Sequence, residues 1–215
     1  MADTNIKVVV RCRPLNSREK NRGASHLIDV VDQKQLVLNP PNETDTRENI
    51  KATKKKPMPF SFDRSFDENT EQHEVFDYIG VDLLEHAFNG FNTCVFAYGQ
   101  TGSGKSHSMV GYAQERGLIP LTCSRLFDDI AEKTAADPHL KISVEVSYIE
   151  IYNEKVRDLL NPKNNSNLKV REHPVLGPYV EDFSKLIVDS FEGIESLMDE
   201  GNKVSIGDST ASGSS

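Results

Sequence analysis

Long apolar runs are missing from this 215-residue chain, and their absence excludes whole classes of protein. No stretch approaches the roughly 18 consecutive apolar residues that a membrane helix needs. The N-terminus also lacks a basic segment followed by an apolar one, which is the pattern of a secretory signal. We therefore expect neither a membrane span nor a secretory signal.

Cysteine and positive charge are also scarce. The three cysteines, Cys12, Cys94 and Cys123, are an odd number in apolar settings and predict reduced core thiols in a cytosolic protein. No CxxC pair or cluster of histidine and cysteine suggests a metal site. Lys and Arg number 25 against 33 Asp and Glu, and the net charge of −8 argues against a general nucleic-acid binder. A local basic patch for an acidic partner stays open.

One short stretch, "AYGQTGSGKSHSM" at residues 97–109, carries a recognisable chemistry. It follows an apolar, β-branched and aromatic run at residues 94–98, which predicts a buried strand that feeds a tight turn. The spacing G-x-x-x-x-G-K-[ST] then predicts a loop whose backbone N–H groups surround phosphates. The phosphate-binding candidates are Gly99, Gln100, Thr101, Gly102, Ser103, Gly104, Lys105 and Ser106.

Within this loop, Lys105 is expected to reach the outer phosphates and the Ser106 hydroxyl to bind Mg²⁺. The alternative is a chance glycine-rich turn between a strand and a helix. We prefer a purine nucleoside triphosphate with Mg²⁺, because the motif, the preceding strand and the following helix agree.

The remaining sequence predicts strands that alternate with helices, so the fold class is α/β. In the first half we expect strands at residues 6–10, 27–31 and 35–38, and a helix that Asn69 caps and Gly90 ends. In the second half we expect an amphipathic helix at 118–130, one long central strand within 140–154, and a helical turn in "VRDLLNP" that Pro162 stops. A strand pair at 168–171 and 179–183 follows, and then a helix that Ser190 caps and Gly201 ends.

Four stretches together resemble the kinesin motor domain: "VVVRCRPLNSRE", "FAYGQTGSGKSHSM", "SYIEIYNEKVRDLL" and "REHPVLGPYVEDFSKL". The resemblance runs from about residue 5 to residue 203 and is strongest to the vesicle-transporting third kinesin class. It implies a P-loop NTPase of kinesin-motor type, with a central mixed β-sheet flanked by helices and with the C-terminal part of the domain missing. On this basis residues 1–203 are the N-terminal portion of a motor domain, and 204–215 are a divergent Ser/Gly-rich tail for which we expect disorder.

The resemblance also assigns binding roles to matching positions. Arg11, Arg13, Pro14 and His107 would border the adenine of ATP or ADP, which is plausible because guanidinium and imidazole planes stack on purines. Without the resemblance, we would interpret His107 as a helix-surface residue. Lys169, Arg171 and His173 would contact acidic tubulin, whereas by charge alone they are an exposed basic cluster.

Two motifs of the kinesin family do not occur in the sequence: a first switch of the form N-x-x-S-S-R-S-H and a second switch, D-x-A-G. We therefore assign no catalytic residue. Because one charged group can supply about 10³- to 10⁵-fold in phosphoryl transfer, we expect the chain alone to hydrolyse almost no ATP.

Three functions remain open. The resemblance implies an ATP-dependent microtubule motor, a microtubule-stimulated ATP hydrolase of the cytoplasm and cytoskeleton, whose cargo partners this segment does not encode. The missing switches favour a nucleotide- or microtubule-binding fragment without turnover. A GTPase or small-molecule kinase is disfavoured, because "NKVS" at residues 202–205 lacks the aspartate of an N-K-x-D guanine site.

Overall fold

The structure is a computed structural model. It describes residues 6–40, 56–112, 114–161, 163, 167–175 and 177–211, with no side chains described beyond residue 203. The chain divides into two compact units, Met1–Leu118 and Ile119–Ser215. The predicted turn end at Pro162 and the end of the predicted tail, residues 212–215, lie outside the described residues.

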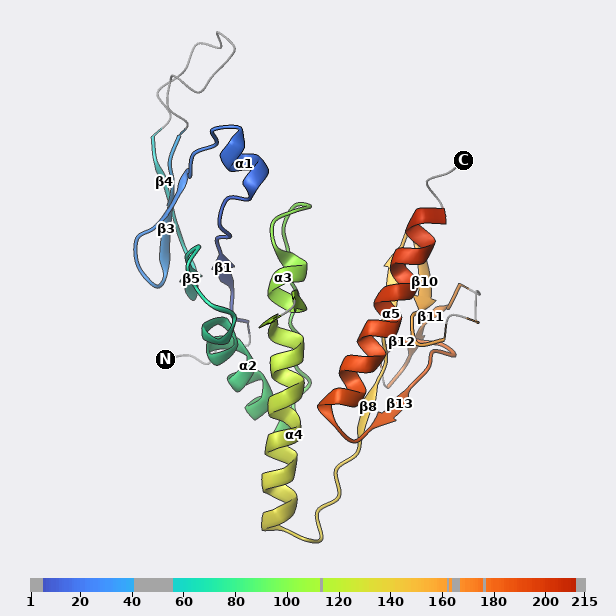
Figure 1. The fold of residues 1–215 in the computed structure, drawn as a ribbon. Helices are drawn as coiled ribbons and strands as arrows, with labels where there is room; N and C mark the ends of the chain where they lie inside the picture. The colour runs from blue at the N-terminus through green and yellow to red at the C-terminus, as the bar shows by residue number, and fades with distance from the viewer. Residues whose placement is uncertain are drawn as a thin grey trace. The chain divides into compact units, whose positions relative to one another are not determined.

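The first unit contains small sheets built from short strands (Figure 1). The predicted strand at 6–10 is displaced toward the C-terminus, because β1 (Val9–Arg11) begins later and pairs in parallel with β5 (Arg64–Phe66). The strands predicted at 27–31 and 35–38 are confirmed. They form β2 (Ile28–Val30) and β3 (Gln35–Leu38), and β4 (Met58–Ser61) adds to β3 in the antiparallel sense.

Helix α2 (Gln72–Phe88) buries three apolar side chains of the first unit, those of Val75, Phe76 and Leu84. Its N-cap is Glu71, paired with Glu74 in a capping box, so the prediction of Asn69 as the cap is wrong. Asn69 instead donates its backbone N–H to Asp67, which turns the chain before the helix. The predicted end at Gly90 is confirmed: Phe91 N–H bonds to the His86 carbonyl. The buried apolar side chains of the first unit are Leu36, Phe66, Val75, Phe76, Leu84 and Leu118.

The predicted strand at residues 94–98 does not form among the described residues. Phe96 and Tyr98 are 82% and 97% exposed, and Cys94, which was expected to be a core thiol, is exposed as well. A segment becomes a strand only when a neighbouring backbone pairs with its N–H and C=O groups. The apolar pattern therefore failed to predict both the pairing and the burial of this segment.

The second unit begins in helix α4 (Leu118–Ala136), which confirms the helix predicted at 118–130 and extends it. Neither α4 nor the other helices in the described part of the chain combine the length and hydrophobicity that a bilayer crossing requires.

The long strand predicted within 140–154 is divided in two. β8 (Val144–Val146) pairs with β13 (Leu186–Val188), whereas β9 (Ile149–Tyr152) forms a hairpin with β10 (Lys155–Asp158). Asn153 and Glu154 both have positive φ, which is the backbone of a tight two-residue hairpin turn. The predicted helical turn in "VRDLLNP" is therefore wrong, because Val156 to Asp158 are strand residues that this turn folds back onto β9.

The strand pair predicted around "EHPVLGP" is confirmed with shifted ends. It consists of β11 (Val170–His173) and β12 (Gly177–Val180), which run antiparallel. Leu168 joins it to the β9–β10 hairpin through a bridge to Val156. The buried apolar side chains of this unit are Val156, Leu159, Leu168, Val188, Phe191 and Ile194.

Helix α5 (Phe191–Ala211) starts as predicted, since Gly193 N–H bonds to the Ser190 hydroxyl at 3.2 Å. The predicted end at Gly201 is wrong, because the helix continues through residue 211 and so includes most of the predicted tail. A Cβ on Gly201 would lie 2.6 Å from the Tyr148 ring. Glycine is therefore required here for close approach and not as a cap.

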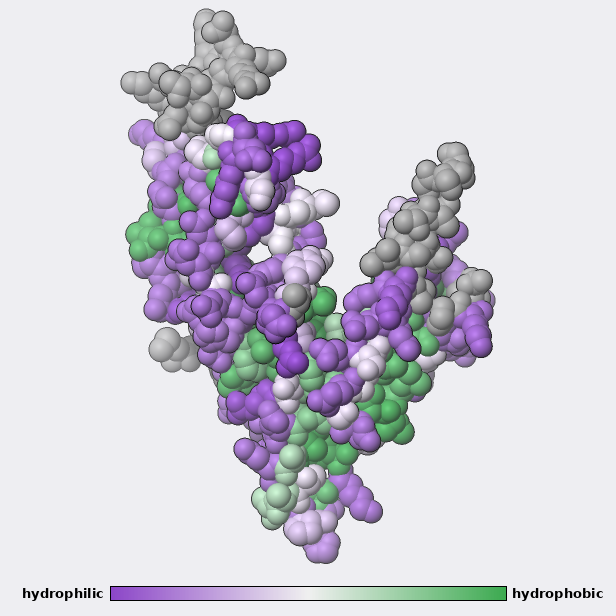
Figure 2. All heavy atoms as spheres, viewed as in Figure 1, coloured by the Kyte–Doolittle hydropathy of each residue, from purple (hydrophilic) through white to green (hydrophobic). Residues whose placement is uncertain are grey.

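The architecture is α/β, as predicted, but the described strands form six separate sheets of two or three strands and not one central sheet. Ladders within these sheets are antiparallel except for β1–β5. Apolar side chains consequently remain on the surface. Figure 2 shows them gathered over the β8–β13 sheet, where Ile187 is 75% exposed.

The contact between α5 and Tyr148 predicts how substitutions at Gly201 change the free energy of unfolding. We expect Gly201→Ala to lower the free energy of unfolding by about 1–3 kcal/mol, because the added methyl overpacks against the Tyr148 ring. Gly193→Ala is the matched control on the same helix: its Cβ meets nothing closer than 3.6 Å, and alanine should raise stability by about 0.5–1 kcal/mol. Urea denaturation followed by circular dichroism measures both. Equal effects of the two variants would contradict the packing explanation.

Candidate phosphate-loop site

The G-x-x-x-x-G-K-S loop connects residues 94–98 to helix α3 (Lys105–Met109) in the first unit. Gly104 is the N-cap residue of α3 and has φ of 99°, a left-handed backbone that a side chain disfavours. Residues 99 and 102 also have positive φ, so the loop curls before it enters the helix. This is the backbone path that the sequence motif requires for N–H groups to converge on an anion.

Lys105 and Ser106, which are predicted to bind the outer phosphates and Mg²⁺, lie at the start of α3. Lys105 is half-buried, and its Nζ donates to the carbonyls of Gly99 and Gln100 at 2.8 and 2.9 Å. These bonds hold the ammonium at the first turn of the loop. Ser106 follows and is exposed.

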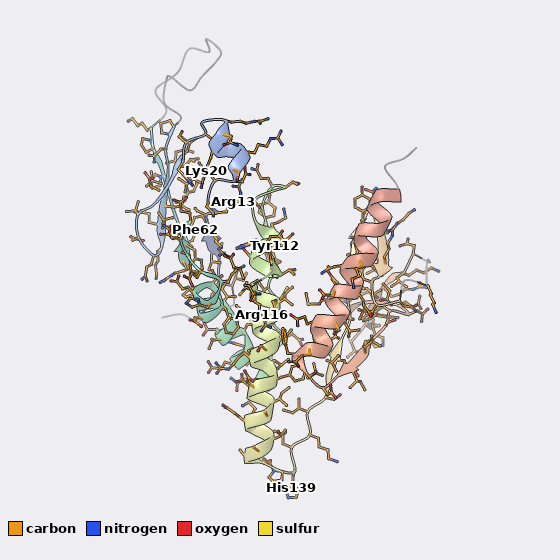
Figure 3. The ribbon with its side chains drawn as sticks, in the orientation of Figure 1. Arg13, Lys20, Phe62, Tyr112, Arg116 and His139 are labelled. Carbon is orange, nitrogen blue, oxygen red and sulfur yellow. The ribbon has the colours of Figure 1, made fainter. Side chains whose placement is uncertain are left out.

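Arg13 ties the loop to the end of β1 (Figure 3). Its Nε donates to the Gly102 carbonyl at 2.7 Å, and its two terminal nitrogens bond to both carboxylate oxygens of Glu19 at 2.8 and 2.6 Å. Glu19 belongs to α1 (Ser17–Asn21), a helix that the sequence analysis missed. The guanidinium therefore fixes the distance between the loop and α1 through its planar fork.

Glu19 has a strongly perturbed acidity. The Arg13 guanidinium, and after it the Asn16 backbone N–H, lower the pKa of Glu19 from 4.5 to about 2. The carboxylate is therefore ionised at any pH at which the protein is ordinarily handled, and the link between α1 and the loop stays charged.

The second arginine, Arg11, faces the start of α2. Its Nη1 donates to the Gln72 side-chain oxygen at 2.5 Å and to the Ser108 hydroxyl at 3.2 Å, and its Nη2 donates to the Thr70 carbonyl at 3.0 Å. Burial lowers the pKa of Arg11, and the charge of Glu115 opposes that shift. Arg11 nevertheless remains a cation, because guanidinium groups stay protonated in proteins.

His107 lies in the same network. Gln72 Nε2 donates to the His107 carbonyl at 2.6 Å, and His107 Nε2 lies 2.9 Å from a Glu115 carboxylate oxygen. The ring also lies beside Tyr112, with centroids 5.8 Å apart. The structure thus joins Arg11 and His107 through Gln72, and Arg13 contacts the carbonyl of Pro14. Both guanidinium groups act only as donors in these bonds.

The three candidate microtubule contacts lie in the second unit. Lys169 precedes β11, and Arg171 and His173 belong to it, so their spacing of two places all three side chains on one face of the hairpin. All three are exposed. The Arg171 guanidinium bonds to Glu181 at 3.0 Å, so this face carries a paired acidic residue as well as positive charge.

One of the predicted residues, Ser106, has a side chain suited to binding Mg²⁺. Among the described residues, no cluster of three histidine, cysteine or acidic side chains is suited to a metal ion. Mg²⁺ at a nucleotide site does not need such a cluster, because phosphate oxygens and waters supply most of its ligands. The exposed hydroxyl of Ser106, directly after Lys105, is a hard oxygen ligand of the required type.

Sequence reasoning missed Glu19, Gln72 and Glu115. A local signal for Glu19 exists: "NSRE" at residues 16–19 has capping-box spacing, and Asn16 and Glu19 form that box. Gln72 has no local signal as a contact residue, because its partners Arg11 and His107 lie 61 and 35 positions away.

A family model described as the kinesin motor domain matches residues 11–214. The chain belongs to the kinesin motor domain family. This confirms the resemblance drawn from the four sequence stretches, and the match extends beyond residue 203 into the Ser/Gly-rich segment.

Curated relatives agree with the predicted class. The chain is 47% identical over 213 residues to Kinesin-like protein KIF1A of Rattus norvegicus and 50% identical over 212 residues to Kinesin-like protein KIF13A of Mus musculus. Both are consistent with the vesicle-transporting third class. The alignments include 94% of this chain but 12% of each relative, so this kinesin-like chain spans a small part of their length.

Solved structures confirm the fold. A KIF14 dimer with AMP-PNP in complex with a microtubule matches with a TM-score of 0.81 at 37% identity, covering 93% of this chain and 54% of that one. A structure described as that of a fast kinesin matches with a TM-score of 0.80 at 33% identity, over 93% of this chain and 52% of that one. The chain thus has the kinesin motor fold, of the P-loop NTPase type, and spans about half of these solved chains.

The Arg13–Glu19 contact predicts how the loop anchor responds to acid. Because the pKa of Glu19 is depressed when folded, its contribution to stability is present above the unfolded value of 4.5 and is lost as the pH falls through about 2. We expect Arg13→Lys to raise the pKa of Glu19, since an ammonium cannot bind both carboxylate oxygens. NMR titration of the Glu19 carboxyl carbon measures this change.

His26→Gln is the control for that titration, because the charge of His26 is the weakest of the causes that lower the Glu19 pKa. It should raise the pKa by less than Arg13→Lys does. A larger shift in His26→Gln would show that Arg13 is not the dominant partner.

Proposed function

We propose that this chain is the nucleotide-binding half of an ATP-dependent microtubule motor, and that residues 99–106 bind ATP or ADP with Mg²⁺. The observation that carries the proposal is the geometry of the loop: left-handed Gly104 at the start of α3, with Lys105 held at the first turn. Membership of the kinesin family supports it. KIF14 chains solved with AMP-PNP and with ADP, each in complex with a microtubule, support both the nucleotide and the partner.

The proposed chemistry divides between the loop and its flanks. The loop N–H groups and the Lys105 ammonium neutralise the phosphates, and Ser106 offers an oxygen to the metal. Bound Mg²⁺ supplies charge neutralisation at the phosphate oxygens. This arrangement binds and orients a triphosphate, and the chain's own residues include no group that we assign to cleavage.

The adenine would lie against Arg11, Arg13, Pro14 and His107. The hydrogen bonds of the two arginines are compatible with this role, because guanidinium N–H groups point outward in the plane of the group and their bonds do not themselves occupy its flat faces. His107 likewise offers a ring face, since both of its nitrogens are near protein partners.

A second candidate function is a nucleotide- or microtubule-binding fragment without turnover, which would act in the cytoplasm on microtubules as the motor does. The observation in its favour is that this sequence contains neither N-x-x-S-S-R-S-H nor D-x-A-G. The two candidates share the binding site and differ in whether bound ATP is hydrolysed.

Lys105→Ala tests the shared site. Removing the ammonium should weaken Mg·ADP binding by about tenfold to a hundredfold, the loss expected for one bond to a charged group. Isothermal titration with the 215-residue chain measures the affinity. Lys34→Ala, at an exposed position in the β2–β3 turn, is the matched control and should bind as the wild type does. Undiminished binding by Lys105→Ala would refute the assignment of the loop.

Steady-state ATP turnover, with and without microtubules, separates the two candidates. Microtubule-stimulated turnover that is lost in Lys105→Ala selects the motor enzyme. Lys105-dependent binding without turnover selects the binding fragment.

The β11–β12 hairpin generates a prediction about the microtubule. Because Glu181 pairs with Arg171 at 3.0 Å, we expect Glu181→Gln to release the guanidinium and strengthen binding, and Arg171→Glu to weaken it. Each exposed charge should change the affinity by about twofold to fivefold at low salt, and less at higher ionic strength. Co-sedimentation with microtubules measures the binding. Identical binding of the two variants to microtubules would contradict the proposal that this hairpin lies in the interface.

A further inference from the structure

Gln72 lies at the centre of a polar network beside the phosphate loop. It is the first residue of α2 and is 9% exposed, so its amide has little access to water. Its oxygen accepts from Arg11 at 2.5 Å, and its nitrogen donates to the His107 carbonyl at 2.6 Å. The same nitrogen lies 3.4 Å from His107 Nδ1.

The orientation of this amide follows from the chemistry of its neighbours. A guanidinium has only donors and a backbone carbonyl only accepts. The atom facing Arg11 must therefore be the amide oxygen, and the atom facing His107 must be the amide nitrogen. The flipped amide would place a donor against a donor and an acceptor against an acceptor.

The fixed amide in turn determines the protonation of the His107 ring. Because Gln72 presents N–H groups toward Nδ1, that ring nitrogen is favoured as an acceptor and carries no proton. The single proton of the neutral ring then resides on Nε2, which faces the Glu115 carboxylate at 2.9 Å. Donation runs in one direction, from Arg11 to Gln72, from Gln72 to His107, and from His107 to Glu115.

We propose that Gln72 is a positioning residue for the nucleotide site: its amide fixes the Nε2–H tautomer and the place of His107, so that the imidazole offers a ring face and no free nitrogen to the base. The tautomer follows from the hydrogen bonds alone. The effect on the base rests on the proposed nucleotide function.

The substitution Gln72→Glu reverses the polarity at one point of the network while keeping the side-chain shape. One carboxylate oxygen can still accept from Arg11. The other replaces the donor to His107, where it repels the carbonyl and favours a proton on Nδ1. The variant should therefore carry a proton on Nδ1, the ring nitrogen that accepts from Gln72 in the wild type.

Two-bond ¹H–¹⁵N correlation spectra of the 215-residue chain test the tautomer, since they distinguish protonated from unprotonated ring nitrogens. The chain has six histidines, and the His107 signals are assigned by their loss in His107→Phe. The wild type should show an unprotonated Nδ1 and a proton on Nε2, whereas Gln72→Glu should show a proton on Nδ1. A protonated Nδ1 in the wild type, or an unprotonated Nδ1 in a folded Gln72→Glu variant, would overturn the proposal.

Two controls separate the hydrogen bond from charge alone. Gln114→Glu adds the same charge at an exposed turn residue next to Glu115, so it should leave Nδ1 unprotonated. Glu115→Gln is the reverse isosteric exchange at the other end of the network, and its amide oxygen still accepts from Nε2, so the tautomer should persist. A protonated Nδ1 in Gln114→Glu would attribute the change to charge and overturn the role of the Gln72 bond.

Binding of two probes tests the effect on the base. Gln72→Glu should weaken Mg·ADP binding by about tenfold, the worth of one hydrogen bond, and leave inorganic tripolyphosphate binding within about twofold, because the loop and Lys105 are untouched. Equal loss for both probes would show general damage to the loop and overturn the base-side role. If the wild type binds neither probe, the proposed function fails, while the tautomer measurement still decides the role of Gln72 toward His107.

Discussion

The geometry of the phosphate loop depends on the hydrogen bonds that the Arg13 guanidinium makes. It bonds at once to the Gly102 carbonyl inside the loop and to Glu19 on α1, while its own backbone follows β1. A loop rich in glycine loses much conformational entropy when it is ordered, so a loop of this kind needs an external anchor. Here the anchor is a charge-assisted, two-pronged contact, which is stronger and more directional than a neutral hydrogen bond.

Around that anchor, the polar groups of the first unit are arranged by donor and acceptor type. Arg11 can only donate, Glu115 can only accept when ionised, and Gln72 and His107 can do either. The orientations of Gln72 and His107 are therefore determined by Arg11 and Glu115, whose hydrogen-bonding roles are fixed. A buried amide that satisfies both of its ends in this way costs little to desolvate, whereas a half-satisfied one would destabilise the site.

The sequence predicts the loop, the longer helices and several of the short strands, because their signals are local: glycine spacing, apolar periodicity and the Ser190 cap. It fails where a contact distant in sequence decides the outcome. Residues 94–98 have the composition of a buried strand yet have no strand partner among the described residues. Val156 to Asp158 look helical until the Asn153–Glu154 turn folds them onto β9. The contacts of Gln72 escape sequence reasoning for the same reason, since they join segments far apart in the chain.

Gly201 shows what such a distant contact demands of a single position. Glycine in a helix interior is unfavourable by roughly 0.5–1 kcal/mol relative to alanine, yet α5 accepts one where its backbone meets the Tyr148 ring. Since no residue is smaller than glycine, every exchange at this position adds atoms to a contact that has no room for them. The position therefore has no conservative replacement. In a randomly mutagenised library selected for folded protein, residue 201 should remain glycine even though its backbone is ordinary helix.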